Sequence, residues 1–158
     1  MIATRFCLAV LLSAAGFPAG VAAQDAPPPK FDAAAAARVG ADANGMRRYV
    51  LVVLKTGPTP VTDPEARKAM FAGHFANMER LSKEGKLALA GPFGKNDDGW
   101  RGLFLLAVDD VEAARALAET DPVIRQGEMV AEYHPWFGSA AAMLVPGLHE
   151  TLVQGPAP

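Results

Sequence analysis

The sequence predicts an α+β domain whose elements follow the order β-α-β-β-α-β. Three observations carry this prediction: four apolar or alternating runs of strand length, two segments with helical caps, and Gly-, Pro- and Asn-rich turns between them. The domain is expected to span residues 46–137 of the 158-residue chain. That length is sufficient for one small hydrophobic core.

The first strand and the first helix have the clearest boundaries. The run YVLVVL at residues 49–54 is rich in β-branched side chains and is followed by a Gly-Pro turn. A helix is then expected from Asp63, an N-cap residue, with Pro64 at the first helical position. Gly85 is expected to end it.

The second half of the domain predicts three more strands and one more helix. Short apolar segments at 86–90 and 100–108 flank a loop rich in Gly, Asn and Asp, which predicts a hairpin. A helix is expected over 111–119 after two aspartates, and the alternating segment 128–136 predicts the last strand. Right-handed crossovers place both helices on one face of an antiparallel sheet, which is the ferredoxin-like arrangement.

The strands also indicate a second apolar face on this sheet. Residues 49–54 and 100–108 are apolar on both sides, whereas two helices cover only one side. A symmetric copy of the chain packing its own sheet there would bury the open face, so we expect a homodimer. The alternative is that the C-terminal tail, residues 138–158, folds over this face within the same chain, through 143–145 and Leu148.

The N-terminal segment, residues 1–23, has the three-part layout of a secretory signal peptide. Arg5 gives a basic start, an apolar stretch follows, and small residues precede Gln24. We therefore expect a periplasmic or secreted protein without stable membrane insertion after cleavage; an uncleaved anchor is the alternative. Cys7, the only cysteine, would be removed with this segment. Residues 24–45, with three consecutive prolines and an alanine run, predict a linker.

Charge and composition exclude several classes of partner. The chain has 15 basic and 17 acidic residues, and its formal net charge is −2. No basic patch, phosphate-binding loop or dinucleotide-binding motif is present in the sequence. We therefore expect neither nucleic-acid binding nor a cofactor.

His74 is the most informative candidate for chemistry. At helical spacing it shares an apolar stripe with Met70, Met78 and Leu81, so it is expected to face the core, where an imidazole needs a hydrogen-bond partner. Asp121, in the segment ETDPVIRQG, is the candidate partner. The two residues are either a core histidine and a turn-capping aspartate, or an acid–base pair.

Five features of the chain occur in an order that resembles a known family. They are the run YVLVVL, His74, the segment GKLALAGP ending in Gly91-Pro92, the pair Asp121-Pro122, and a final strand ending near Pro135-Trp136. Over about residues 48–137 the chain resembles the YCII-related family. The resemblance implies a ferredoxin-like fold, usually dimeric as an α/β barrel, and an active-site pair at His74 and Asp121. One member type of this family is a dehydrochlorinase acting on a chlorinated aromatic-derived compound.

An acid–base site at these residues would use a carboxylate to fix the tautomer of a neutral imidazole. The free ring nitrogen would take a proton from a small apolar substrate, followed by elimination or isomerisation. The site walls are expected to be Met70, Phe71, Met78, Gly91, Pro92, Phe93 and Trp136. We thus predict a small-molecule lyase or isomerase. The alternatives are a non-catalytic binder of a small apolar ligand and a dimerisation module of the cell envelope.

A metal site is a further alternative. His74, His134 and Asp121 could converge in space, but no HxxxH spacing is present, and catalytic zinc needs three well-placed ligands. We therefore expect no metal.

Overall fold

The computed structural model describes residues 30–155. The chain divides into two units, Met1–Phe31 and Asp32–Pro158, and the elements below belong to the second. The expected signal peptide, residues 1–23, lies outside the described residues. None of the helices between residues 30 and 155 is long and apolar enough to cross a bilayer.

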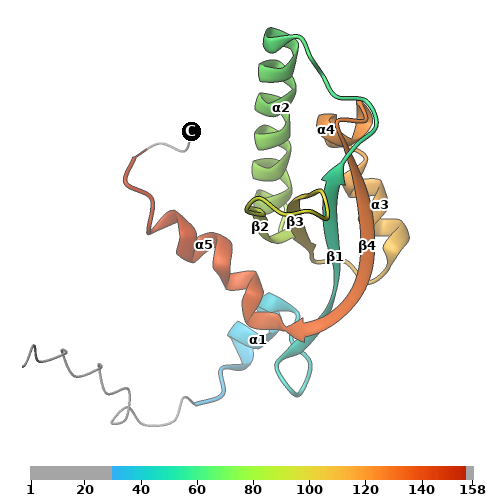
Figure 1. Cartoon of the computed structure of the whole chain (residues 1–158). Helices are drawn as coiled ribbons and strands as arrows, with labels where there is room; N and C mark the ends of the chain where they lie inside the picture. The colour runs from blue at the N-terminus through green and yellow to red at the C-terminus, as the bar shows by residue number, and fades with distance from the viewer. Residues whose placement is uncertain (1–29, 156–158) are drawn as a thin grey trace, which may run out of the picture. The chain divides into compact units, whose positions relative to one another are not determined.

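The second unit contains a four-stranded antiparallel sheet in the order β2-β3-β1-β4. The elements between the first and last strand are, in chain order, β1 (Met46–Thr56), α2 (Pro64–Lys83), β2 (Leu87–Pro92), β3 (Trp100–Leu106), α3 (Val111–Ala118), α4 (Pro122–Arg125) and β4 (Met129–Ser139) (Figure 1). The predicted α+β class and the ferredoxin-like order are confirmed. The short helix α4 is an addition, because the Asp121-Pro122 pair starts a further helical turn as well as ending the preceding segment.

The strands β1 and β4 are longer than expected because they pair over their whole length. The register runs from Met46 opposite Ser139 to Thr56 opposite Met129, and the two ribbons lie side by side in Figure 1. Pro135 lies within β4, where its missing N–H is tolerated because β4 is an edge strand.

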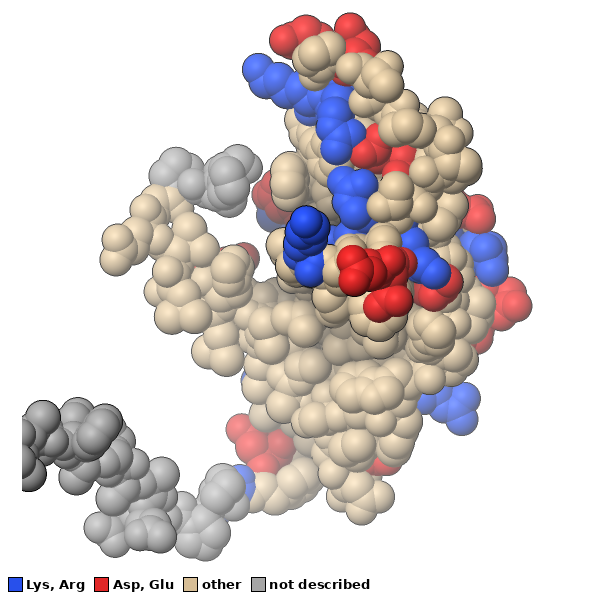
Figure 2. Space-filling model, in the orientation of Figure 1, with Lys and Arg blue, Asp and Glu red and all other residues tan. Residues whose placement is uncertain are grey.

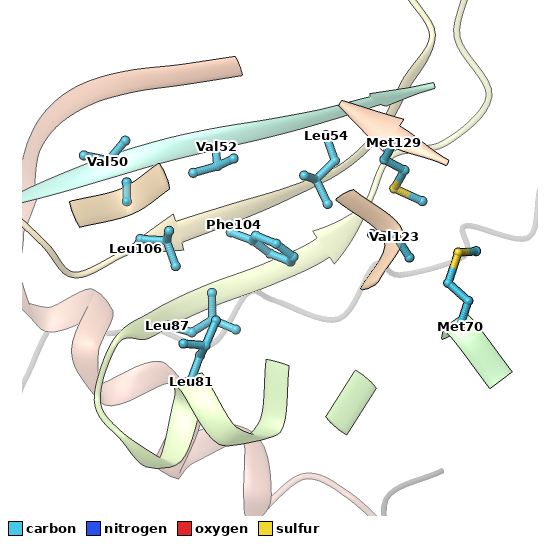
Figure 3. Close-up of a cluster of buried hydrophobic side chains, with 11 residues drawn as sticks. Val50, Val52, Leu54, Met70, Leu81, Leu87, Phe104, Leu106, Val123 and Met129 are labelled. Atoms are coloured by element: carbon cyan, nitrogen blue, oxygen red, sulfur yellow. The ribbon is translucent and has the colours of Figure 1, made fainter. Parts of the chain in front are cut away.

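The main core lies between the sheet and the helices α2, α3 and α4. Alternate residues of β1 point into this core. The pairing of Val52 with Phe104 directs alternate residues of β3 into the same core. The buried cluster, drawn in Figure 3, consists of Val50, Val52, Leu54, Met70, Leu81, Leu87, Phe104, Leu106, Ala114, Val123 and Met129. Packing in this core fixes the position and orientation of α2 relative to the sheet. His74 lies on α2, so its position is fixed as well.

The helix α2 begins and ends where the sequence indicates. The Asp63 side chain accepts a hydrogen bond from the Ala66 amide at 2.8 Å, and Pro64 is the first helical residue. Gly85 follows the helix with a φ of 66°, a conformation that favours glycine. On the face shown in Figure 2, basic and acidic side chains are interspersed over the region of α2.

The C-terminal segment packs on the opposite face of the sheet. It forms the 3₁₀ helix η1 (Ala140–Leu144) and then α5 (Val145–Glu150). Ala142 and Met143 contact a second buried cluster, made of Tyr49, Ala88, Leu105 and Ala107. The tail thus covers one part of this face within the same chain, as the alternative interpretation anticipated, but among the residues named for it Met143 makes the contact whereas Leu148 is 61% exposed.

Another part of the same face remains open to solvent. Leu89 and Val130 are 44% and 43% exposed, and Trp136 is 46% exposed although its ring packs on Tyr49. Residues paired across neighbouring strands project to the same face of the sheet. Leu89, for example, is paired with Leu105, which lies on this face. The sheet therefore has one face covered by helices and one face covered in part.

Part of the segment expected to be a linker forms the helix α1 (Ala33–Val39). Asp32 caps its N-terminus, and Gly40 ends it in the left-handed region. The Arg47 side chain, at the start of β1, donates a hydrogen bond to the Val39 carbonyl at 2.8 Å. This bond ties the C-terminal end of α1 to the sheet.

Candidate functional site

The site is centred on a buried hydrogen bond between α2 and the residue that precedes α4. The Nδ1 atom of His74 lies 2.7 Å from Oδ2 of Asp121, although 47 positions separate the residues in the chain. The His74 side chain is 11% exposed and that of Asp121 is 0% exposed. The structure therefore brings together the two residues singled out by sequence.

Asp121 uses each of its carboxylate oxygens for a different contact. Oδ1 accepts a hydrogen bond from the Val123 amide at 3.1 Å and so caps α4. Oδ2 accepts from His74 and also, at 3.4 Å, from the side-chain amide of Asn77. The turn-cap interpretation and the histidine-partner interpretation of Asp121 thus both hold.

The close approach of α2 and α4 depends on a glycine. A Cβ atom placed on Gly73 would lie 3.0 Å from Cγ of Pro122, closer than such contacts normally are. Since Gly73 precedes His74 and Pro122 follows Asp121, the absence of a side chain on Gly73 allows His74 and Asp121 to approach each other.

Asn77 is part of the site and is not among the residues predicted from sequence. Its Oδ1 atom accepts hydrogen bonds from Arg80 at 2.8 Å and from the Thr120 hydroxyl at 2.9 Å. These two donors fix the amide orientation and direct its NH₂ group toward Asp121. A signal exists in the sequence, because Asn77 falls three residues after His74 on the same side of the helix.

The second ring nitrogen of His74 is available for chemistry. Because the Asp121 carboxylate accepts at Nδ1, that nitrogen carries the proton and Nε2 carries the lone pair. Within residues 30–155, no hydrogen bond involves Nε2 of His74. Every buried side-chain nitrogen in that range has a hydrogen-bond partner, so the unpaired Nε2 is accessible to solvent. The aromatic rings of Phe71, Phe75 and Phe104 lie with their centroids 5.4–6.0 Å from the imidazole.

His74 lines a cavity of about 350 Å³ between α2 and the strands β2 and β3. The walls are otherwise apolar or glycine, apart from Arg101. The lining residues are Leu54, Phe71, His74, Phe75, Met78, Gly91, Pro92, Phe93, Arg101, Gly102, Leu103, Phe104 and Met129. The volume and the aromatic walls suit a small, predominantly apolar molecule.

Five of the seven predicted wall residues line this cavity, namely Phe71, Met78, Gly91, Pro92 and Phe93. The structure places the other two elsewhere. Met70 is 3% exposed and belongs to the core between sheet and helices. Trp136 pairs with Tyr49 across β4 and β1, and its ring stacks on Tyr49 at 5.5 Å, on the face of the sheet away from His74. The same alternation puts His134, opposite Leu51, away from His74, so those two histidines do not converge.

Two further cavity residues, Arg101 and Gly102, depend on an irregularity in β3. The register passes from Leu54 opposite Gly102 to Lys55 opposite Trp100, so Arg101 is an extra residue in the strand. A bulge of this kind redirects a side chain, and the Arg101 side chain lines the cavity. Gly102 is buried and leaves room where another residue would project its Cβ. A bulge has no simple sequence signal, which is why neither residue was predicted.

A buried carboxylate lies beside Arg101. Glu128 is 3% exposed, accepts a hydrogen bond from the Arg67 guanidinium, and accepts another from the Val61 amide at 2.8 Å. Nη1 of Arg101 lies 3.8 Å from the same carboxylate. The hydrogen bond from Arg67 holds the pKa of Glu128 below its ordinary value; burial opposes this shift, while the Val61 amide and the charges of both arginines reinforce it.

Comparison with known proteins places the chain in a family. Residues 48–136, more than half of the chain, match the YCII-related domain. Uncharacterized protein YjpA of Bacillus subtilis (strain 168) is 29% identical over 65 residues, which cover 41% of this chain and 73% of that protein. A solved structure of 5-chloro-2-hydroxyhydroquinone dehydrochlorinase (TftG) from Burkholderia phenoliruptrix AC1100, in complex with 2,5-dihydroxybenzoquinone, is 23% identical, with a TM-score of 0.40. It covers 56% of this chain and 92% of that one.

The matched residues begin in β1 and end in β4, and they include both His74 and Asp121. The chain therefore belongs to the YCII-related domain family.

Proposed function

We propose that this protein is a small-molecule lyase or isomerase in which His74 abstracts a proton from a predominantly apolar substrate. One observation carries the proposal: the 2.7 Å contact between His74 and Asp121 occupies Nδ1, while no hydrogen bond within residues 30–155 involves Nε2 and His74 lines the adjoining cavity. A fully buried histidine that served packing alone would use both ring nitrogens in internal hydrogen bonds.

Asp121 has two effects in this proposal. Its carboxylate accepts the Nδ1 proton, so Nε2 keeps the lone pair that acts as the base. When Nε2 takes up a proton, the buried carboxylate stabilises the resulting imidazolium. General-base catalysis of this type contributes about 10²- to 10⁴-fold in rate. The bond to the Val123 amide and the contact from Asn77 hold the carboxylate in place.

The reaction begins with a carbon acid. The C–H bond breaks, its proton goes to Nε2 of His74, and its electron pair forms a new double bond. In an elimination, the electron pair displaces a leaving group from the neighbouring carbon. In an isomerisation, the proton returns to a different carbon of the same molecule.

The experiment is a turnover and deuterium-exchange screen in D₂O, read by proton NMR. The panel consists of small cyclic compounds with an acidic C–H bond or a leaving group, and includes 5-chloro-2-hydroxyhydroquinone. We expect loss of a leaving group or exchange of a carbon-bound proton with the wild-type protein, and a fall of at least about 10²-fold in His74→Asn.

The control is Arg48→Gln, at an exposed position, and it should turn over the same compounds at the wild-type rate. Turnover that persists in His74→Asn contradicts the proposal. Binding of panel compounds without any reaction also contradicts it and favours the non-catalytic binder.

We also propose that the open part of the second sheet face joins two copies of the chain. Leu89 and Val130 are large apolar residues that remain more than two-fifths exposed on that face. A self-complementary contact about a twofold axis would bury both copies at once. Light scattering after size exclusion should give twice the chain mass for the wild type and a shift toward monomer for Leu89→Lys. A wild-type monomer at micromolar concentration contradicts this proposal.

We propose finally that the protein is exported, with residues 1–23 removed as a signal peptide. The support is the layout of this segment and the location of the only cysteine, Cys7, within it. Cell fractionation followed by N-terminal sequencing is the test. We expect an envelope or secreted product that begins near Gln24. A cytoplasmic product that retains Met1 contradicts the proposal.

A further inference from the structure

The cavity beside His74 holds a second polar side chain that the proposed reaction does not yet use. Of the cavity residues, only His74 and Arg101 have polar side chains. Placing a guanidinium against apolar walls is unfavourable unless a negative charge accompanies it. The position of Arg101 therefore raises the question of which group neutralises it.

The position of Arg101 is built into the strand. It is the extra residue where β3 loses register with β1, between the pairs Leu54–Gly102 and Lys55–Trp100. The Arg101 carbonyl accepts a hydrogen bond from the Phe93 amide at 3.0 Å, which holds the bulge against the end of β2. Since bulges occur beside active sites as a means of re-aiming a side chain, this one has a local structural reason to be functional.

Protein groups leave most of the Arg101 guanidinium free. Its nearest carboxylate is Glu128, and the 3.8 Å separation exceeds hydrogen-bond length. Glu128 already accepts from Arg67 and from the Val61 amide. In the part of the chain that the structure describes, the Arg101 side chain donates no hydrogen bond and is 31% exposed. Two guanidinium groups against one carboxylate leave the cluster with one excess positive charge.

We propose that Arg101 binds an anionic oxygen of the substrate, so that the substrate class is a small ring compound carrying a carboxylate or a phenolate. A guanidinium presents its N–H donors in a planar fork that matches such oxygens. The aromatic side chains of Phe71, Phe93 and Phe104 supply the walls against which the ring packs. This inference rests on the proposed function, since it names the substrate class for the same cavity.

The consequence for the reaction concerns charge. Proton abstraction from carbon leaves an electron pair that is delocalised onto an oxygen of the substrate whenever the two are conjugated. A fixed cation at that oxygen stabilises the developing charge more strongly in a cavity with apolar walls than in water. Arg101 would then both select the substrate and lower the barrier.

The test compares an anionic probe with a neutral probe of the same shape. Benzoate and benzamide are titrated into the full chain, and binding is followed by calorimetry and by the ring resonances of His74. We expect tighter binding of benzoate, with an affinity that falls as ionic strength rises. In Arg101→Gln the benzoate Kd should rise about tenfold or more, while the benzamide Kd changes by less than about twofold.

Arg48→Gln removes the same charge from an exposed position on β1 and is the matched control; both its Kd values should equal those of the wild type. Retained benzamide binding shows that Arg101→Gln is folded. Three results overturn the inference: equal affinities for the two probes in the wild type, a preference for benzoate that survives in Arg101→Gln, or no benzoate binding at millimolar concentration.

The two proposals fail separately. If His74→Asn abolishes turnover of a panel compound while benzoate and benzamide bind alike, only the role of Arg101 is wrong. If benzoate binding depends on Arg101 and no compound reacts, the anion site stands and the enzymatic function does not.

Discussion

Gly73 of α2 faces the Pro122 ring of α4, and each is adjacent to one member of the His74–Asp121 pair. A Cβ on Gly73 would lie 3.0 Å from Cγ of Pro122. The geometry of the pair therefore depends on a residue that has no side chain of its own. This dependence can be tested without altering either functional group.

In Gly73→Ala, we expect a small net change in stability and a larger change in the site. Alanine favours a helix interior over glycine by about 1 kcal/mol, which offsets part of the strain against Pro122. The displacement of Pro122 carries Asp121 with it and lengthens the contact to His74. Thermal unfolding should thus shift little, while turnover and the His74 ring resonances change.

The matched control for this substitution is Ala72→Gly, at an exposed position on the same helix. It should lower stability by about 1 kcal/mol and leave the His74 resonances in place. Unchanged ring resonances in Gly73→Ala would show that the glycine has no influence on the pair.

Asp121→Asn should keep the N-cap of α4 while removing the negative charge beside His74. Asparagine is also a good N-cap, so α4 is retained, and we expect a loss of about 1–2 kcal/mol in the free energy of unfolding. In the wild type, the carboxylate accepts a hydrogen bond from Nδ1 of His74. In Asp121→Asn, the side-chain amide donates to Nδ1 instead, so the imidazole proton moves to Nε2. Turnover should fall by about 10²- to 10⁴-fold.

Nitrogen NMR of the His74 ring checks this expectation directly. The wild type should show a protonated Nδ1, and Asp121→Asn a protonated Nε2. The same tautomer in both proteins would refute the role assigned to the carboxylate. Asp121→Ala, which removes the cap as well, should be less stable than Asp121→Asn.

Glu128 should make the stability of the fold depend on acid pH. Its pKa is lowered in the folded state, first by the hydrogen bond from Arg67, so its stabilising contribution is fully present above the ordinary pKa of a glutamate, near 4.5. The contribution is lost as the pH falls through the lower, folded-state pKa. At neutral pH, Glu128→Gln should cost about 1–3 kcal/mol in the free energy of unfolding.

Urea unfolding of Glu128→Gln and the wild type over a pH series is the measurement. The difference in stability should shrink as the pH falls below about 4.5. Glu132→Gln, which breaks the exposed pair with Lys55, is the control and should cost no more than about 1 kcal/mol. A difference for Glu128→Gln that is constant across this pH range would contradict the assignment.

Gly102 provides a test of the cavity. A Cβ on Gly102 would enter the cavity wall and lie 3.1 Å from the Gly91 carbonyl oxygen. We expect Gly102→Ala to weaken benzamide binding severalfold and Arg48→Gln, at an exposed position on β1, to leave the Kd unchanged. Calorimetry is the measurement, and an unchanged Kd in Gly102→Ala would show that the ligand binds elsewhere.

The elements that sequence predicted well are those with local chemical signals. Asp63 and Pro64 define the start of α2 by capping, and Gly85 defines its end by its left-handed conformation. The proximity of His74 to Asp121 was predictable because a histidine on a buried stripe needs a partner; the segment ETDPVIRQG offered Asp121, and the family resemblance agreed with that choice.

The features that sequence missed depend on register and packing. The stripe on α2 was predicted to pass through Met78, whereas the structure buries Asn77 and places Met78 at the cavity. Both positions fall within the angular width of a buried face, so helical periodicity alone does not choose between them. The bulge at Arg101 requires knowledge of how β3 pairs with β1.

Trp136 illustrates the same difficulty at an edge strand. Its side of the sheet is set by the pairing with Tyr49, and a shift of one residue would move it to the other face. The C-terminal tail was left between two alternatives for a related reason, because apolar residues such as Met143 indicate burial without indicating against which chain.

The divided use of the Asp121 carboxylate links the His74–Asp121 contact to local folding. The same carboxylate accepts from the imidazole and caps α4, so we expect the four-residue helix to unwind when the carboxylate turns away. Exchange of the Val123 amide hydrogen with solvent should therefore report on the integrity of this contact. Heat or mutation that first frees this one amide should separate His74 from Asp121 while the sheet is still intact.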